Sequence, residues 1–289
     1  MMEFKNKKVD NIKRINGKDY TFEHDSSEEA WEHYKIIYFK PDGSSRINSK
    51  YDLKNEKQQL VLCNYKDKKY YNEPNSKYPY VNRYYWLSGE ATYDEKSGEY
   101  SGEKENLSGD CDFNFNERKY IIYERMIEDE YKDYPRIKKY ALNLLLECNN
   151  MHHSLLNFSL IQTKGNMQGF KGGCLNNGVY ASLDRADTLV SYLANYYKLQ
   201  DYQKRDSYII ANAGVNKDTL KEYLDSFKDI YDYCKKIYLI DNEKFVDRMI
   251  KEGCLLIKTG HDVVRYMLLA LEFWDRKEFK IKEIYGNIK

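Results

Sequence analysis

Residues 149–181 contain side chains whose types and spacing could carry out chemistry. Asparagine, glutamine, serine, threonine and histidine dominate this stretch, and its only full charges are Lys164 and Lys171. By contrast, 32% of the whole chain is charged. Five of the fifteen glycines also lie here. A neutral, polar and glycine-rich segment suits a site that holds its ligand by hydrogen bonds.

The glycines of this stretch allow a ligand to approach the backbone closely. Their N–H groups, helped by the two lysines, could bind an anion ahead of a helix expected near Leu183. The spacing fits neither a P-loop nor a dinucleotide fingerprint, so a structural connector built from glycine turns is the favoured interpretation. The binding candidates are Lys164, Gly165, Asn166, Gln168, Gly169, Lys171 and Arg185.

His152 and His153 are candidate general bases or metal ligands. Neighbouring residues point about 100° apart on a helix, so both would rarely bind one metal. No H-E-x-x-H motif and no nearby acid supports zinc, and a buried histidine bonded to backbone is favoured. Asp184 and Asp187 share a helix face and could hold a metal or fix an arginine, although helix capping plus a salt bridge is the favoured interpretation. If the protein is an enzyme, these four are its candidate catalytic residues.

Other catalytic motifs are weak or missing. Pro41-Asp42 followed by Asp52-Leu53-Lys54 echoes metal-dependent nucleases. However, similar acid-x-lysine triplets recur along this lysine-rich chain, and Pro41-Asp42 suits a turn better. There is no G-x-S-x-G serine-hydrolase elbow. We therefore expect no metal and no cofactor.

Composition limits the compartment and the partners. A net charge of +1 gives no global electrostatic case for nucleic acid or an anionic membrane. The six cysteines lie at least twenty residues apart, so no zinc knuckle or redox pair is present. The first residues lack the apolar core of a signal peptide, and no apolar run is long enough to span a membrane. The expected location is cytoplasmic.

The elements that must position these residues divide at Pro135. All four prolines lie in the first 135 residues, and the long helical patterns follow them. Aromatic and β-branched runs predict strands before this point, while 41–44 predicts a turn. The expected strands are 33–40, 59–65, 80–87 and 113–123, with an acidic solvated loop or long hairpin at 89–112 and a short helix near 125–131.

Apolar residues spaced three and four apart predict helices after Pro135. The first, from 136, would bury Ile137, Tyr140, Ala141, Leu144, Leu145 and Cys148. The other predicted helices cover about 183–199, 217–239, 243–251 and 262–274. The helix at 217–239 has a heptad seam of Leu220, Leu224, Phe227, Tyr231, Cys234 and Tyr238. The predicted class is α+β, with a strand- and loop-rich region, 1–135, packed on a helical region, 136–289. The two regions can equally form one continuous domain.

A pattern in the helical region carries a resemblance. The run His153–Leu160 (HSLLNFSL), then Gly165-Asn166, then Leu183-Asp184-Arg185-x-Asp187, resembles a loosely defined group of uncharacterised bacterial and phage proteins. No activity is established for that group, so the resemblance implies no catalytic residue. It implies a prokaryotic or phage cytosolic protein, and by context a role in phage–host conflict, for example inhibition of a defence complex such as Gabija.

Two classes of function follow. In the first, the chain binds another protein or complex and does no chemistry. Its thirty tyrosines, the acidic segment and the heptad seam favour this class, and a homo-oligomer is possible. In the second, it is a hydrolase or nuclease acting on a nucleotide or nucleic acid around Gly165–Gly173, the two histidines and Asp184–Asp187. Such an enzyme needs a histidine beside another polar group in an open pocket.

Overall fold

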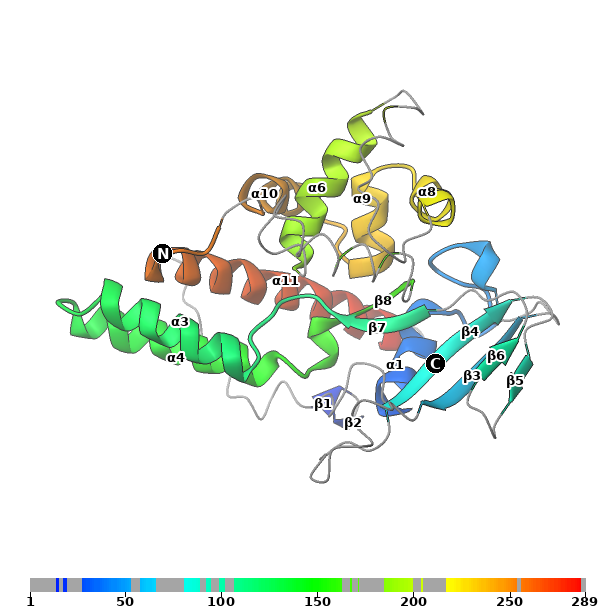
Figure 1. Cartoon of the computed structure of the whole chain (residues 1–289), viewed down its shortest axis with the longest axis horizontal. Coiled ribbons are helices and arrows are strands. Elements are labelled where there is room, and N and C mark those ends of the chain that lie inside the picture. Colours follow the sequence, from blue (N-terminus) through cyan, green and yellow to red (C-terminus); the bar gives the residue numbers. More distant parts are fainter. Residues whose placement is uncertain are drawn as a thin grey trace.

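The structure is a computed structural model and describes part of the chain. The described residues are 14–15, 18–19, 28–52, 58–65, 81–88, 92–94, 99–101, 107–162, 167, 171, 185–199, 204, 217–253 and 256–286. Over these residues the fold is mostly helical, with small antiparallel strand pairs (Figure 1). The predicted α+β class is confirmed in this coarse form, with helices dominating after Pro135.

The strands in the described ranges pair two by two, always antiparallel. The pairs are β1 (Arg14–Ile15) with β2 (Lys18–Asp19), β3 (Gln58–Tyr65) with β4 (Val81–Ser88), β5 (Thr92–Asp94) with β6 (Glu99–Ser101), and β7 (Leu107–Cys111) with β8 (Phe158–Gln162). The strands predicted at 59–65 and 80–87 are thereby confirmed. The β7–β8 ladder joins the two regions that the sequence separates at Pro135, and the division at Pro135 stays a prediction.

The longest helix, α11, lies between two groups of helices. The helices are α1 (Glu28–Tyr38), α3 (Glu117–Glu130), α4 (Pro135–Met151), α6 (Ala186–Lys198), α8 (Lys217–Asp225), α9 (Ile230–Tyr233), α10 (Glu243–Glu252) and α11 (Gly260–Gly286), with short helical turns η2 (Ser49–Tyr51), η3 (Leu155–Asn157) and η4 (Cys234–Tyr238). Figure 1 shows the α3–α4 hairpin along one side of α11, and α6, α9 and α10 on the other. Both groups bury apolar side chains in one core.

The strand predicted at 33–40 is wrong, because this segment belongs to helix α1. Its buried residues, Ala30, His33, Tyr34, Ile37 and Tyr38, recur every three or four positions and form one helical face. Aromatic and β-branched content suggested a strand, but packing of that face decides the outcome. The predicted turn after it is confirmed, with Gly43 at φ 81° and its N–H donating to Lys40 O at 2.8 Å.

The strand predicted at 113–123 is also wrong. Helix α3 begins at Glu117, where the Asn116 side chain accepts a hydrogen bond from the Lys119 N–H at 2.9 Å. This N-cap was the missed signal. In the acidic segment before it, β5 and β6 form a short hairpin and residues 107–111 form β7. Within the predicted solvated loop or long hairpin, residues 107–112 are therefore not a solvated loop, since they form β7 and end at the buried Asp112.

The long helix predicted at 217–239 is broken. Helix α8 ends at Asp225, and Asp229 starts α9 by accepting from the Asp232 N–H at 2.8 Å. Because of the break, Tyr231 lies outside the predicted seam. Its hydroxyl donates a hydrogen bond to the Asp247 carboxylate at 2.7 Å. The helices predicted at 136–148, 243–251 and 262–274 are confirmed, although α11 continues to Gly286.

Gly253, which follows α10, is predicted to tolerate no side chain. A Cβ there would lie 2.0 Å from the Asp187 carbonyl oxygen of α6. We expect Gly253→Ala to lower the free energy of unfolding by about 1–3 kcal/mol through overpacking. Gly286→Ala is the matched control, because a Cβ there meets nothing within 4 Å. Urea denaturation measures both, and an unchanged midpoint for Gly253→Ala would contradict this packing.

Candidate functional site: the α10–α11 groove and the buried polar connector

The structure describes five of the residues proposed from the sequence as site residues. These are His152, His153, Lys171, Arg185 and Asp187. The other candidates lie outside the described residues, namely Lys164, Gly165, Asn166, Gln168, Gly169 and Asp184. The five can therefore be compared with the enzymatic and binding hypotheses.

His152 lies in the core and faces the backbone of the segment before α3. Its Nδ1 is 3.4 Å from the Phe113 carbonyl oxygen and 3.5 Å from the Phe115 nitrogen. The exposed His153 ring lies 4.6 Å from it, edge to face. This is the buried, backbone-bonded histidine favoured by the sequence for this pair.

Lys171, Arg185 and Asp187 are all buried in ion pairs. Lys171 contacts the Asp110 carboxylate and donates to the Cys111 carbonyl oxygen at 2.6 Å. Arg185 Nε donates to Asp187 at 2.9 Å, and its guanidinium stacks on Tyr266 at 4.3 Å. The hollow beside this second pair measures about 10 Å³, close to the minimum for one water. The charges of each ion pair stabilise one another, and the hollow beside Arg185 and Asp187 leaves little room for a ligand.

The uncharged stretch 149–162, at the start of the polar segment 149–181, contains a buried polar network centred on Asn157, which we call the polar connector. Its Oδ1 accepts from the Phe113 N–H at 2.9 Å and from the Trp274 indole at 3.1 Å. Its Nδ2 donates to the carbonyl oxygens of Phe113 and His152, both at 2.9 Å. One amide thus links the residues before α3, the end of α4 and helix α11. Within 149–162 the side chains of Asn157 and Ser159 are buried, while the glycine turns of the predicted connector lie outside the described residues.

A second buried contact fixes α11 against the β7–β8 pair. The Lys277 ammonium donates to Asp112 at 2.8 Å, to Ser159 Oγ at 2.8 Å and to the Phe158 carbonyl oxygen at 2.6 Å. Ser159 Oγ also donates to Asp112. Burial raises the pKa of Asp112, against the pull of Lys277 and Lys171, and burial lowers the pKa of Lys277, against the pull of Asp112. Each charge therefore depends on the other to remain in the core.

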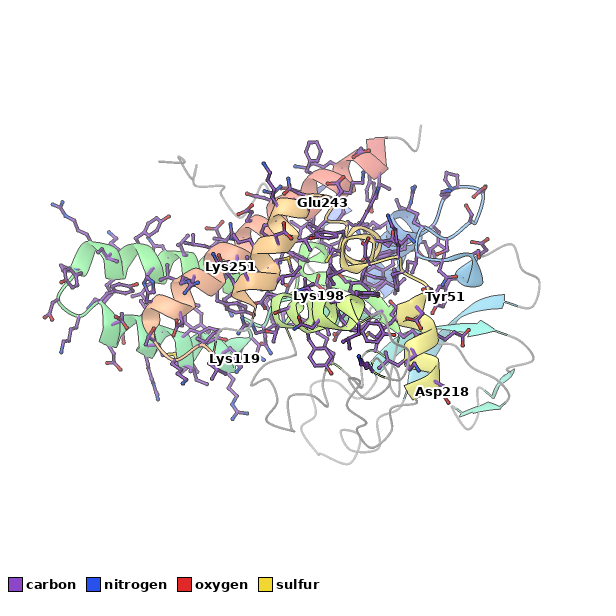
Figure 2. The ribbon with its side chains drawn as sticks, turned by 90° about the horizontal axis from the view of Figure 1, so that it is seen from above. Tyr51, Lys119, Lys198, Asp218, Glu243 and Lys251 are labelled. Carbon is purple, nitrogen blue, oxygen red and sulfur yellow. The ribbon has the colours of Figure 1, made fainter. Side chains whose placement is uncertain are left out.

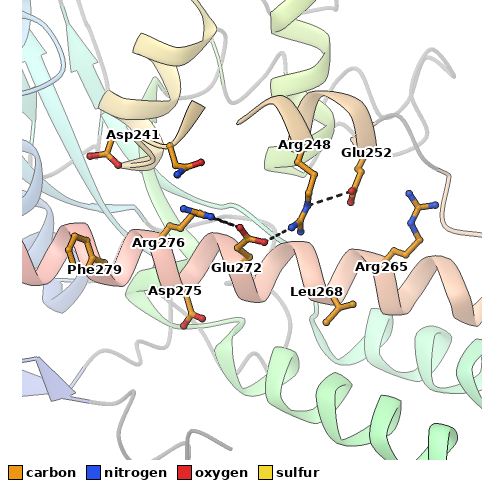
Figure 3. A pocket seen from close by; sticks show the side chains of 10 residues that line it. Asp241, Arg248, Glu252, Arg265, Leu268, Glu272, Asp275, Arg276 and Phe279 are labelled. Carbon is orange, nitrogen blue, oxygen red and sulfur yellow. Dashed lines mark hydrogen bonds and ion pairs between the residues drawn. The ribbon is translucent and has the colours of Figure 1, made fainter. Parts of the chain in front are cut away.

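The anchored helix α11 forms one wall of an open groove, and α10 forms the other (Figure 3). Because Lys277 points inward, the neighbouring Arg276 and Phe279 lie on the outer side. The hollow measures about 810 Å³ and is lined by Asp241, Asn242, Arg248, Glu252, Arg265, Leu268, Glu272, Asp275, Arg276 and Phe279. Sequence reasoning missed this groove, although Phe279 stands out within the charged run RKEFKIKE.

Ion pairs set the shape of the groove floor. Glu272 of α11 contacts Arg248 of α10 and Arg276 of α11, the latter at 2.6 Å. Both guanidinium groups also lie over the ring of the buried Phe245, at 5.4 and 4.9 Å from its centroid. A carboxylate shared by two arginines that also stack on one ring holds the floor in a defined geometry.

Three residues of the groove remain available to a partner. Phe279 is 74% exposed, and Leu268 is half-buried on the same helix. Arg265 has no ion pair with any described residue, and Figure 3 shows its side chain apart from the paired arginines. The groove can therefore offer two apolar contacts and one cationic hydrogen-bond donor.

The comparisons with known proteins add no relative. No protein-family model matches the chain, and neither curated proteins nor solved structures give a match. Within the described ranges, no helix is long and apolar enough to cross a membrane, and no group of histidine, cysteine and acidic residues is arranged to hold a metal ion. The groove and the buried networks behind it are therefore the features from which we infer a function.

Proposed function

We propose that this chain is a non-enzymatic binding protein that acts through protein–protein contacts made by the α10–α11 groove. The observation that carries the proposal is the exposed Phe279 on a groove of about 810 Å³ with a preformed ionic floor. An aromatic side chain exposed beside a hollow can serve as the anchor of an interface.

The spacing along α11 suggests the shape of the partner. Leu268 and Phe279 are eleven positions apart, which corresponds to about 16 Å or three helical turns. A groove with apolar contacts at such spacing and polar groups between them suits an amphipathic helix. Arg265 lies one turn beyond Leu268 and would pair with a carboxylate of that helix. We therefore propose a partner helix with two apolar anchors and an acid near one end.

The resemblance to bacterial and phage proteins supports a biological setting for this proposal. It implies a role in phage–host conflict, so the proposed partner is a bacterial defence complex, with Gabija as the first example to test. An inhibitor of this kind needs a stable contact rather than a catalytic centre. The groove supplies such a contact, while the identity of the complex rests on the resemblance alone.

Cys111 Sγ lies 3.5 Å from His152 Nδ1, a pair of the kind that the enzymatic alternative needs, but neither residue lines the α10–α11 groove or the small hollow beside Arg185. His152 faces backbone, and the Arg185–Asp187 pair is closed over by Tyr266. Neither histidine lines the α10–α11 groove. The glycine loop and Asp184, on which that alternative also depends, lie outside the described residues.

A groove variant tests the proposed function. We expect Arg265→Glu with Phe279→Ser to weaken binding to the partner complex about tenfold or more, because it reverses the free charge and removes the anchor. The measurement is pull-down of purified Gabija complex, and of bacterial lysate analysed by quantitative mass spectrometry, with the tagged chain.

The matched control makes the same changes on α3, away from the groove. Arg118→Glu with Ile121→Ser alters an exposed arginine and an exposed apolar residue there. It should recover the same partner as the wild-type chain. Equal recovery by the groove variant and the control would contradict the proposed function.

A further inference from the structure

We propose that the closed end of the α3–α4 hairpin, residues 128–140, docks on the same surface of a second copy of this chain. We call this surface the hairpin tip. Figure 1 and Figure 2 both show it extending past the beginning of α11, so that its outer residues lie beyond the helix that covers the rest of the hairpin. The inference is independent of the α10–α11 groove.

Apolar side chains of the hairpin tip are left uncovered. Ile137 occupies the same helical face as Ala141, Leu144 and Cys148, which are buried. Ile137 itself is 48% exposed, and its neighbour Tyr140 is 51% exposed. The sequence predicted both to be buried, and the structure shows that the core ends before it reaches them. An apolar seam that continues past its own core is suited to a further partner.

The charges of the hairpin tip are placed against the helix dipoles. Glu128, Asp129 and Glu130 form the last turn of α3, where the dipole favours cations. The first turn of α4 carries bases and no acid, although the dipole there favours anions. The result is an acidic α3 end beside a basic α4 start, with Lys132 and Asp133 in the turn between them.

These charges are not neutralised by ion pairs within the described part of the chain. No salt bridge with those residues involves Glu128, Asp129, Arg136 or Lys139, all of which are exposed. Their local arrangement costs helix stability and gains no intramolecular contact in return. A partner that brings opposite charges to both patches would remove this cost.

A second copy brings these opposite charges in the required order. If two hairpin tips meet about a twofold axis, the acidic α3 end of each faces the basic α4 start of the other. Such an isologous contact is self-complementary, because each pairing occurs twice. Tyr134, Ile137 and Tyr140 lie among these charges and would be covered at the centre. A foreign protein would need the same two patches side by side, whereas this chain already carries them.

Charge reversal distinguishes this contact from any other. One variant carries Glu128→Lys and Asp129→Lys, and the other carries Arg136→Glu and Lys139→Glu. Each should weaken self-association of the full chain about tenfold or more, since like charges then meet at both ends. An equimolar mixture should recover wild-type affinity as a heterodimer, because each reversed patch then meets its opposite. Sedimentation velocity over a concentration series measures all three samples.

Loss of folding cannot imitate this pattern. Both variants improve the match to the helix dipoles, so circular dichroism should show helicity equal to that of the wild type. Lys235→Glu with Lys244→Glu, two exposed positions outside the hairpin, should leave self-association unchanged. A wild-type chain that remains monomeric at every concentration, or a mixture that fails to restore the dimer, would overturn the proposal.

Discussion

Replacing Lys277 with methionine is expected to remove about 3–5 kcal/mol of folding stability. The substitution keeps most of the side-chain volume but leaves the Asp112 carboxylate buried without its cation. It also leaves Ser159 and the Phe158 carbonyl oxygen without the donor that they share. A small globular protein has about 5–15 kcal/mol of stability in total, so much of the chain should become insoluble on expression. Equilibrium urea denaturation of the soluble fraction gives the loss.

Two further variants separate the ion pair from the size of the side chain. Lys282→Met makes the same change on the exposed face of α11 and should cost less than about 1 kcal/mol. Adding Asp112→Asn to Lys277→Met removes the unpaired charge and should recover part of the lost stability. If the double variant is no more stable than Lys277→Met alone, the buried pair does not explain the loss.

Replacing Asn157 with leucine is expected to cost about 3–5 kcal/mol. The change leaves two buried donors, the Phe113 N–H and the Trp274 indole, without their acceptor. Each unsatisfied buried group costs about 1–3 kcal/mol, and the Phe113 and His152 carbonyl oxygens lose a donor as well. Because Trp274 belongs to α11, the near-UV circular dichroism signal of tryptophan should weaken together with the urea midpoint.

The control for this prediction is Asn150→Leu, at an exposed position near the end of α4. It makes the same change outside the core and should alter the midpoint by only a few tenths of a kcal/mol, within the range of surface substitutions. If both asparagine variants lose the same stability, helix propensity and not the connector is responsible.

Local patterns predicted part of this fold. Strands β3 and β4 follow their aromatic and β-branched content, and helices α4 and α10 follow the spacing of their apolar residues. Where the prediction was wrong, a local signal competed with packing. The aromatic run around Tyr34 and Tyr38 suits a strand or a helix, and burial of one helical face selects α1. In 217–239 the apolar spacing continues across the break, and the cap at Asp229 marks the new helix start.

The buried networks could not be predicted, because their partners are distant in the sequence. Lys277 lies within a charged run that suggests a solvated surface, and Asp112 closes an acidic segment. Their contact spans 165 positions. Segment 149–181 was predicted as a polar site for the same reason, because the groups that its side chains contact are distant in the sequence. Asn157 satisfies groups on three segments, and only the tertiary arrangement shows that its side chain faces inward.

The groove depends on these interior contacts. Lys277 and Trp274 fix the rotation of α11, and this rotation places Arg265 and Phe279 outward. The sequence predicted the helix but not which of its charged positions would be anchored. The proposed binding surface is therefore a consequence of the fold rather than of a local motif.

Photo-crosslinking from the groove tests the binding proposal most directly. A photoreactive phenylalanine analogue at position 279, and separately at position 121 on α3, would be activated in the presence of the partner complex. We expect position 279 to form a covalent product with a subunit that the wild-type chain also recovers, and position 121 to form none. Crosslinks from position 121 and none from position 279 would contradict the groove as the binding surface.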